Sequence, residues 1–213
     1  MTYTVKTAIY LFSPASALYA GIEIPGRGLA EVDSAFRVGN FLLKRKEGPL
    51  YIFHSGGRDS FQTGVKMALA SEKVPEEITY SPFLGNNKLE QARKLTNSSG
   101  RLDFAALHEL DPKLLTAISQ EGVSFISQAA RLGRRYASSS IVGVTDSDKV
   151  RLTYATLLSN PIGGSRDLKS RPLDGLLLEL ERYNSTGGVV RAKIAYDEMK
   201  PQQLNLLELK LNL

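Results

Sequence analysis

The sequence predicts an α+β protein with an N-terminal mixed β-sheet, a mainly helical middle and a small α/β part at the C-terminus. Four stretches between positions 4 and 56 carry aromatic and β-branched residues, apolar residues recur at helical spacing in the middle, and the tail at 204–213 alternates like a strand. No strand–helix–strand unit repeats along the chain. We therefore expect one compact unit, in which residues 1–160 carry the site and residues 161–213 form a smaller subdomain.

The composition excludes several classes of site. With 213 residues, of which 42% are hydrophobic and 23% charged, the chain can bury a full globular core. Because it has no cysteine, disulfides, thiolate metal sites and a cysteine nucleophile are excluded. His54 and His108 lie far apart without metal-ligand spacing, so we expect no zinc site. No apolar stretch is long enough to span a bilayer. The formal net charge of +5 favours an anionic partner or a solvated basic surface.

Four short stretches near the N-terminus predict strands. They read TVKTAIYLF, ALYAGIEI, FRVGNFLLKRK and PLYIFHSG, separated by the turns SPAS, PGRG and KEGP. Each stretch is rich in Tyr, Ile, Val or Phe, which favour a pleated, half-buried surface. We interpret the first stretch as a strand and not as a signal peptide, because no long apolar core ends in a small-residue cleavage site.

The middle of the chain predicts helices. In NNKLEQARKL, apolar residues at 89, 92 and 95 share one face, and NSSG ends the helix. LDFAALHEL is short and stops before Asp111 and Pro112, which make an N-cap and first position for the helix KLLTAISQ. Gly122 either weakens that helix or separates it from VSFISQAARLGRRYA. In TDSDKVRLTYATLLS, Thr145 and Asp148 have the spacing of a helix cap.

Two loops and one basic cluster have the composition of anion sites. HSGGRDS follows a predicted strand and precedes a predicted helix, so it is either a simple turn or a loop that offers backbone N–H groups to a phosphate. It lacks the P-loop and dinucleotide fingerprints. Arg134 and Arg135, and the later loop NPIGGSRDLKSRP, have the charge to contact RNA phosphates, or form a solvated basic face.

The segment SFISQAAR raises a sharper question. Gln128 and Arg131 stand three residues apart, so a helix presents both on one face among apolar or small neighbours. This pattern fits either a structural arginine paired with a carboxylate or part of an active site. Periodicity alone does not distinguish the two.

In order along the chain, several stretches resemble the ribosome-inactivating proteins, the rRNA N-glycosidases related to ricin A chain and Shiga toxin A chain. SFISQAARL resembles their catalytic helix, Ser-Glu-Ala-Ala-Arg-Phe, and GPLYIFHSGG resembles their Asn-Ala-Tyr-Val-Val-Gly-Tyr strand. LGNNKLEQA, AALHEL and VRLTYATLLSNPI resemble later segments, the last of which holds the family's tryptophan. The similarity covers residues 36–162 in patches and implies the fold of that family.

The resemblance implies a base pocket. The family removes one adenine from a large-subunit rRNA loop, and the adenine stacks between aromatic side chains. Tyr51 and His108 would form the two faces of the pocket, and Ile52 would meet the base edge. Tyr154 or Ala155 occupies the position of the family's tryptophan.

The catalytic pair departs from the family at one position. Arg131 matches the arginine that protonates the leaving adenine, whereas Gln128 occupies the position of the carboxylate that stabilises the ribose cation. Loss of such a group costs about 10²–10³ in rate. The resemblance therefore implies an N-glycosidase of weak activity, or one silenced by Gln128, whether that residue is natural or introduced.

The resemblance also implies partners. We expect a monomeric translation-inhibiting toxin of the plant-defence type that binds the ribosome and its RNA, without cofactor or metal. Its natural form would be a secreted or vacuolar mature chain acting on cytosolic ribosomes. Two alternatives stay open, namely an ADP-ribosyltransferase-like toxin and a non-enzymatic RNA- or protein-binding module. The first lacks the essential arginine, because Ile52 stands in its place.

Overall fold

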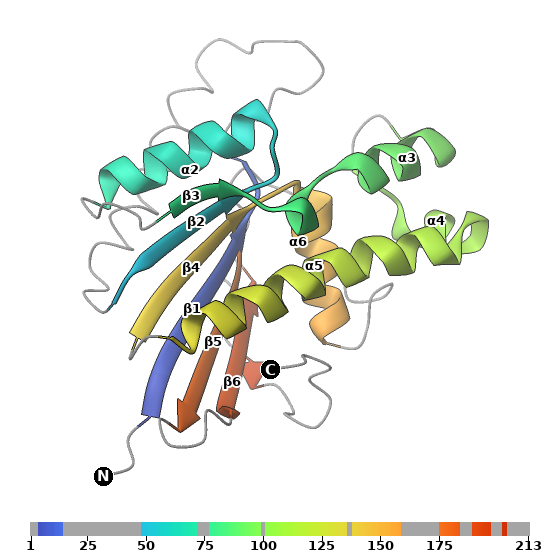
Figure 1. Cartoon of the computed structure of the whole chain (residues 1–213). Coiled ribbons are helices and arrows are strands. Elements are labelled where there is room, and N and C mark those ends of the chain that lie inside the picture. Colours follow the sequence, from blue (N-terminus) through green and yellow to red (C-terminus); the bar gives the residue numbers. More distant parts are fainter. Residues whose placement is uncertain are drawn as a thin grey trace.

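The computed structural model describes residues 4–14, 48–71, 77–98, 101–135, 138–158, 175–183, 189–196 and 202–203. Its strands are β1 (Thr4–Phe12), β2 (Leu50–His54), β3 (Glu77–Tyr80), β4 (Ser138–Val144), β5 (Gly175–Tyr183), β6 (Val189–Tyr196) and β7 (Gln202–Gln203). They form one seven-stranded sheet in the order β3-β2-β4-β1-β5-β6-β7 (Figure 1). The neighbours among β1 to β4 pair in parallel, and β5, β6 and β7 continue the sheet antiparallel.

Helices cover both faces of this sheet (Figure 1). They are α2 (Arg58–Ala70), the short 3₁₀ helix η1 (Pro82–Leu84), α3 (Asn87–Leu95), α4 (Phe104–Leu110), α5 (Pro112–Gly133) and α6 (Ser147–Leu157). Helix α2 packs through Met67 and Ala68 on one face of β1, β2 and β4. Helices α5 and α6 pack on the opposite face. A third apolar cluster joins α3, α4, α5 and α6 to one another.

The central strands are buried on both faces. In β1, Ile9 and Leu11 belong to the core under α5, and Ala8 and Tyr10 belong to the core under α2. Such a strand reads as a continuous apolar run, because each successive side chain enters a core on alternate sides. This explains why the run TAIYLF shows no polar alternation.

Several local predictions are confirmed. Strands occupy 4–12 and 50–54, and helices occupy 58–70, 87–95 and 104–110. Asp111 caps α5, since its carboxylate accepts a hydrogen bond of 2.9 Å from the Leu114 N–H. The cap predicted at Thr145 is wrong, because α6 begins at Ser147 and its N-cap is Asp146, whose carboxylate accepts from the Asp148 N–H.

One glycine allows two helices to approach closely. Gly122 does not divide the helix, because α5 runs unbroken from residue 112 to 133. A Cβ at this position would lie 1.9 Å from Thr153 Oγ1, so the glycine lets α5 and α6 approach closely. The sequence shows a glycine, and only the packing shows its reason.

The fold-class prediction holds in its coarse form, since strands and helices share one layered structure. Its finer form is wrong. The segment 138–144, to which the sequence analysis assigned no element, is a central strand, and β2, α2 and β3 form a parallel strand–helix–strand unit. Strands from residues 1–160 and from 161–213 are hydrogen-bonded in one sheet. The predicted strands at 17–24, 36–46 and 204–213 lie outside the described residues.

Candidate ligand site at the carboxyl edge of the sheet

The four parallel strands end at one edge of the sheet, where ligands of open α/β sheets bind. A hydroxyl residue follows each strand directly: Ser13, Ser55, Ser81 and Thr145. All four side chains are buried. The Thr145 hydroxyl donates to the Leu84 carbonyl at 2.7 Å, and the hydroxyls of Ser55 and Ser60 are 2.8 Å apart. Ser81 Oγ is buried with no hydrogen-bond partner among the described residues. The edge is therefore lined with hydroxyl groups.

His54 lies at this edge as the last residue of β2. Its Nδ1 accepts a hydrogen bond of 3.1 Å from the Gly56 N–H. Its ring meets Phe61 and Tyr80 edge-on, with centroid distances of 5.2 and 6.3 Å. Burial lowers the pKa of His54 below its ordinary value of 6.5, so the imidazole is neutral at pH 7. A neutral ring that accepts at Nδ1 carries its proton on Nε2.

The turn after His54 leads directly into α2. Gly56 has φ of 89°, which favours glycine, and a Cβ there would lie 3.0 Å from the Tyr80 ring. Gly57 is the N-cap residue, and no side chain caps the helix. The first N–H groups of α2 thus lack an intrahelical acceptor and point out of the helix beside the sheet edge. Arg58, the first helical residue, is exposed.

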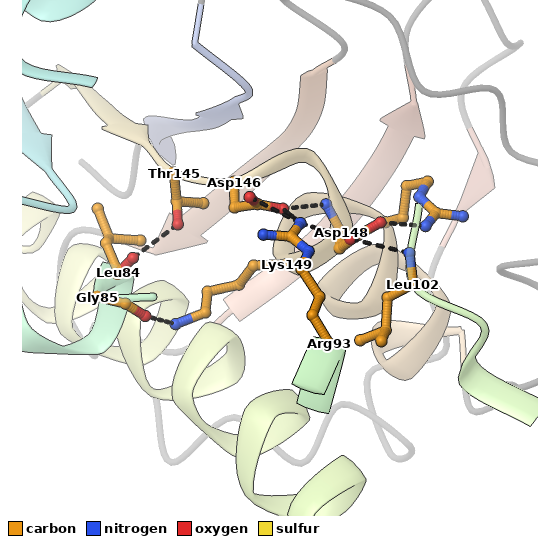
Figure 2. A network of polar contacts seen from close by, with 9 residues as sticks. Leu84, Gly85, Arg93, Leu102, Thr145, Asp146, Asp148 and Lys149 are labelled. Atoms are coloured by element: carbon orange, nitrogen blue, oxygen red, sulfur yellow. Dashed lines mark hydrogen bonds and ion pairs between the residues drawn. The ribbon is translucent and has the colours of Figure 1, made fainter. Parts of the chain in front are cut away.

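A network of charged side chains surrounds the end of β4 (Figure 2). Asp146 follows the strand, caps α6 through the Asp148 N–H, and accepts hydrogen bonds of 2.8 and 2.9 Å from Arg93 Nη2. Asp148 accepts from Arg93 at 2.7 Å, from the Leu102 N–H at 3.1 Å and from Arg151. Burial would lower the pKa of Arg93, but attraction to the two carboxylates outweighs it and raises that pKa.

Lys149 is the second centre of this network. Its side chain is fully buried, and Nζ donates to Glu121 at 2.8 Å, to the Phe83 carbonyl at 3.2 Å and to the Gly85 carbonyl. Burial lowers the pKa of Lys149, and the Glu121 carboxylate partly opposes that shift. Glu121 also pairs with Lys88 at 2.8 Å. The network ties α3, α5, α6 and the turn after η1 together.

These contacts decide which cations are available to a ligand. Arg93, Lys149 and Arg151 each hold a carboxylate of this chain. Arg58 is in no ion pair with any residue the structure describes, and it stands at the start of α2. The arrangement therefore offers an anion the N-terminus of α2, the Arg58 guanidinium and the neighbouring His54 Nε2–H.

The residues predicted for a base pocket lie in different environments. Tyr51, Ile52 and Tyr154 are buried, with 6%, 0% and 2% of their surfaces exposed. His108, Gln128 and Arg131 are exposed, on α4 and on the outer side of α5. Tyr51 and Tyr154 share a core cluster, but it contains Ala129 and Ala130 of α5 and neither Gln128 nor Arg131. Arg134 and Arg135 are exposed just past the end of α5.

Sequence reasoning identified one part of the site and missed another. HSGGRDS was read as a simple turn or an anion loop, and it does join a strand to a helix at the ligand edge. The network around Asp148 and Lys149 was read only as a helix cap, because TDSDKVR has the composition of an exposed first turn. Asp148, Lys149 and Arg151 are buried because α3 and α5 pack against this segment, and the local sequence does not predict that packing.

The structure is similar to solved enzymes over nearly its whole length. Phosphoglycerate mutase from Bacillus anthracis matches with a TM-score of 0.56 and 12% identity, over 88% of this chain and 93% of that one. A mycobacterial glucosyl-3-phosphoglycerate phosphatase gives 0.55 and 13%, over 93% and 100%. Phosphoserine phosphatase from Entamoeba histolytica, in complex with 3-phosphoglyceric acid, gives 0.56 and 11%, over 91% and 98%. No protein-family model and no curated protein matches the sequence.

These matches correct the sequence-based family assignment. The fold is similar to that of this phosphoglycerate mutase and these two phosphatases, so the resemblance to ribosome-inactivating proteins is wrong. The predicted N-glycosidase activity, ribosomal partner and toxin role are wrong with it, and so are the ADP-ribosyltransferase and RNA-binding alternatives. Short matches around an arginine misled because small residues are common on helix faces that pack closely. In the described residues, no helix has the length and apolarity needed to cross a membrane. The comparisons establish the fold. In open α/β sheets of this kind, ligands bind at the carboxyl edge of the sheet.

Proposed function

We propose that this protein binds a small phosphorylated molecule at the carboxyl edge of its sheet, with the phosphate at the N-terminus of α2. The observation that carries the proposal is the uncapped start of α2 directly after β2, with Arg58 as its first residue. Backbone N–H groups and the positive end of the helix dipole favour an anion there. The names of the similar structures, phosphoglycerate mutase and two phosphatases, agree with a phosphate ester as ligand.

The groups around the turn suit the rest of such a ligand. His54 presents Nε2–H as a hydrogen-bond donor, because its Nδ1 is occupied by the Gly56 N–H. The buried Ser81 hydroxyl next to β3 has no hydrogen-bond partner in the described part of the chain. A buried hydroxyl of this kind gains a hydrogen bond when a polar ligand arrives.

We further propose that binding does not lead to phosphoryl transfer onto histidine. A histidine nucleophile needs a ring-nitrogen lone pair directed at phosphorus. His54 is the histidine at this edge, and its Nδ1 lone pair faces the Gly56 N–H, while Nε2 holds the proton. The carboxyl ends of β1 and β4 carry Ser13, Thr145 and Asp146 in place of an imidazole. The side chains thus serve recognition: Arg93, Lys149 and Arg151 are paired with carboxylates, which leaves Arg58 as the cation for the phosphate.

Calorimetric titration with 3-phosphoglycerate, using glycerate as the unphosphorylated control, tests the binding. We expect saturable binding of the phosphorylated compound only. Arg58→Gln should weaken it by about three- to tenfold, the usual effect of losing one exposed charge-assisted contact. Lys66→Gln is the matched control, because it removes one positive charge from the same helix, two helical turns after Arg58. Equal binding of glycerate, or equal weakening by the two variants, would contradict the proposal.

A phosphate-release assay with 3-phosphoglycerate and phosphoserine tests the second statement. We expect release at the buffer rate, unchanged in His54→Asn. Release well above that rate, abolished in His54→Asn, would show that His54 takes part in hydrolysis and would overturn the statement that the site only binds.

A further inference from the structure

A second cluster of polar groups lies at the amino edge of the sheet, at the opposite ends of β1 and β4 from the site above. At its centre is Arg182 of β5, whose surface is 1% exposed. Nη1 donates to Thr7 Oγ1 at 3.2 Å, and Nε and Nη2 have no hydrogen-bond partner among the residues that the structure describes. Among the described residues, no carboxylate forms an ion pair with this guanidinium.

This arrangement is costly for the protein alone. Arginine keeps its charge at any pH a protein experiences, so it cannot escape burial by losing a proton near neutrality. A buried charge without a partner destabilises a fold strongly, and buried donors without acceptors add to the cost. Burial, with repulsion from Arg134, lowers the pKa of Arg182 to about 10, which is still well above neutrality. The cluster therefore holds a buried positive charge that an anion would stabilise.

The unpartnered atoms have the geometry of an oxyanion site. Because Nη1 turns to Thr7, the free nitrogens are Nε and Nη2, the edge of the guanidinium that binds two oxygens through parallel hydrogen bonds. Among the described residues, Ser139 Oγ is also buried without a hydrogen-bond partner, and it lies on the same face of the sheet, since Ser139 pairs with Thr7. Both hydroxyls lie beside Gly133, where a Cβ would be 2.6 Å from Thr7 Oγ1 and 3.0 Å from Ser139 Oγ.

The end of α5 completes the surroundings. Gly133 is the last residue of the helix, and a side chain there would collide with Thr7 and Ser139. Arg134 follows directly, is exposed, and lies close enough to Arg182 to repel it. A second arginine beside an unpaired one is unfavourable unless an anion sits between them. Because Arg134 is exposed and acts on Arg182, the buried cluster lies next to a solvent-exposed side chain.

We propose that the fork of Arg182 and the hydroxyl of Ser139 bind a small tetrahedral oxyanion of the phosphate type, below the last turn of α5. Two arginines and two hydroxyls match an anion that carries more than one charge and several acceptor oxygens better than they match a carboxylate. The site is separate from the carboxyl edge and does not depend on the function proposed there. Its occupant joins β1, β4, β5 and the end of α5, so binding stabilises the whole sheet.

The test is thermal unfolding in phosphate, sulfate, acetate and chloride at matched ionic strength, with Arg58→Gln as a separate variant; the rise assigned to the present site is the part that Arg58→Gln leaves unchanged. We expect phosphate and sulfate to raise the midpoint saturably, as a ligand specific for the folded state does. Arg182→Met should abolish the rise, and Ser139→Ala should reduce it. Arg135→Gln, which removes an exposed arginine nearby, should leave it unchanged.

A direct reading comes from the NMR signal of the Arg182 Nε–H group, which should shift on addition of phosphate and stay unshifted in acetate. If Arg182→Met does not fold, Arg182→Lys serves instead, because it keeps the charge and loses the fork, and it should still lose the phosphate-dependent rise. A rise in acetate equal to that in phosphate overturns the choice of a tetrahedral anion. An equal rise in all variants, or none in the parent protein, overturns the site.

Discussion

Asp148 offers a sharp test of how the fold is held together at its ligand edge. Its carboxylate is 1% exposed and binds two guanidinium groups, those of Arg93 and Arg151, together with the Leu102 N–H. Asp148→Asn keeps the shape, removes the charge and turns an NH₂ group toward donors. Breaking a buried pair in this way costs about 3–5 kcal/mol. We expect the free energy of unfolding, measured in urea, to fall by that amount with an unchanged m value.

Asp146→Asn is the matched control for this variant. The Asp146 side chain is 19% exposed, its partner Arg93 keeps Asp148, and asparagine caps a helix as well as aspartate does. We therefore expect a loss of about 1 kcal/mol. The double variant with Asp148→Asn and Arg151→Met should recover part of the larger loss, because it removes a buried cation together with its partner. A cost for Asp148→Asn no larger than that for Asp146→Asn would refute the reasoning that burial sets the size of the effect.

Three further outcomes follow from the packing. Gly122→Ala should destabilise the protein by about 1–3 kcal/mol in urea unfolding, because its Cβ would lie 1.9 Å from Thr153 Oγ1, and combination with Thr153→Ser should not worsen it. The NMR titration midpoint of His54 should lie below 6.5, since burial disfavours the charged ring; its contribution to stability is full above 6.5 and is lost as the pH falls through the lowered pKa. Asp111→Ala should lower the unfolding free energy by about 1 kcal/mol, and Asp111→Asn by less, because the cap on Leu114 is kept.

Elements with local sequence signals were predicted correctly, whereas a strand that depends on its neighbours was missed. Helices α3 and α4 and the start of α5 follow from apolar spacing and from Asp111-Pro112, which are local signals. Strand β4 was missed because SSSIVGV carries three serines and a glycine, none of which favours a strand. It is a strand because β1 and β2 enclose it on both sides and pair with it along its length.

The family assignment failed for a related reason. Short matches such as SFISQAAR reflect a close-packed helix face, where Ala129 and Ala130 are buried and the polar residues on either side of them, Gln128 and Arg131, are exposed. Helices in unrelated folds also place small residues on a close-packed face. The same segment therefore serves as structure here, whereas the resemblance implied chemistry.

By itself, the sequence determined the absence of cysteine chemistry, the Asp111 cap and the strand–turn–helix character of LYIFHSGGRDS, since each depends on residue type or on neighbours within a few positions. Only the tertiary structure decided that β1 to β4 end together, that Asp148 and Lys149 are buried, and that Arg182 faces no carboxylate among the described residues. These properties depend on segments far apart in the chain, such as β1 and β5, being brought into contact. The residue type determines the charge of a side chain, whereas the tertiary structure determines its ion-pair partner.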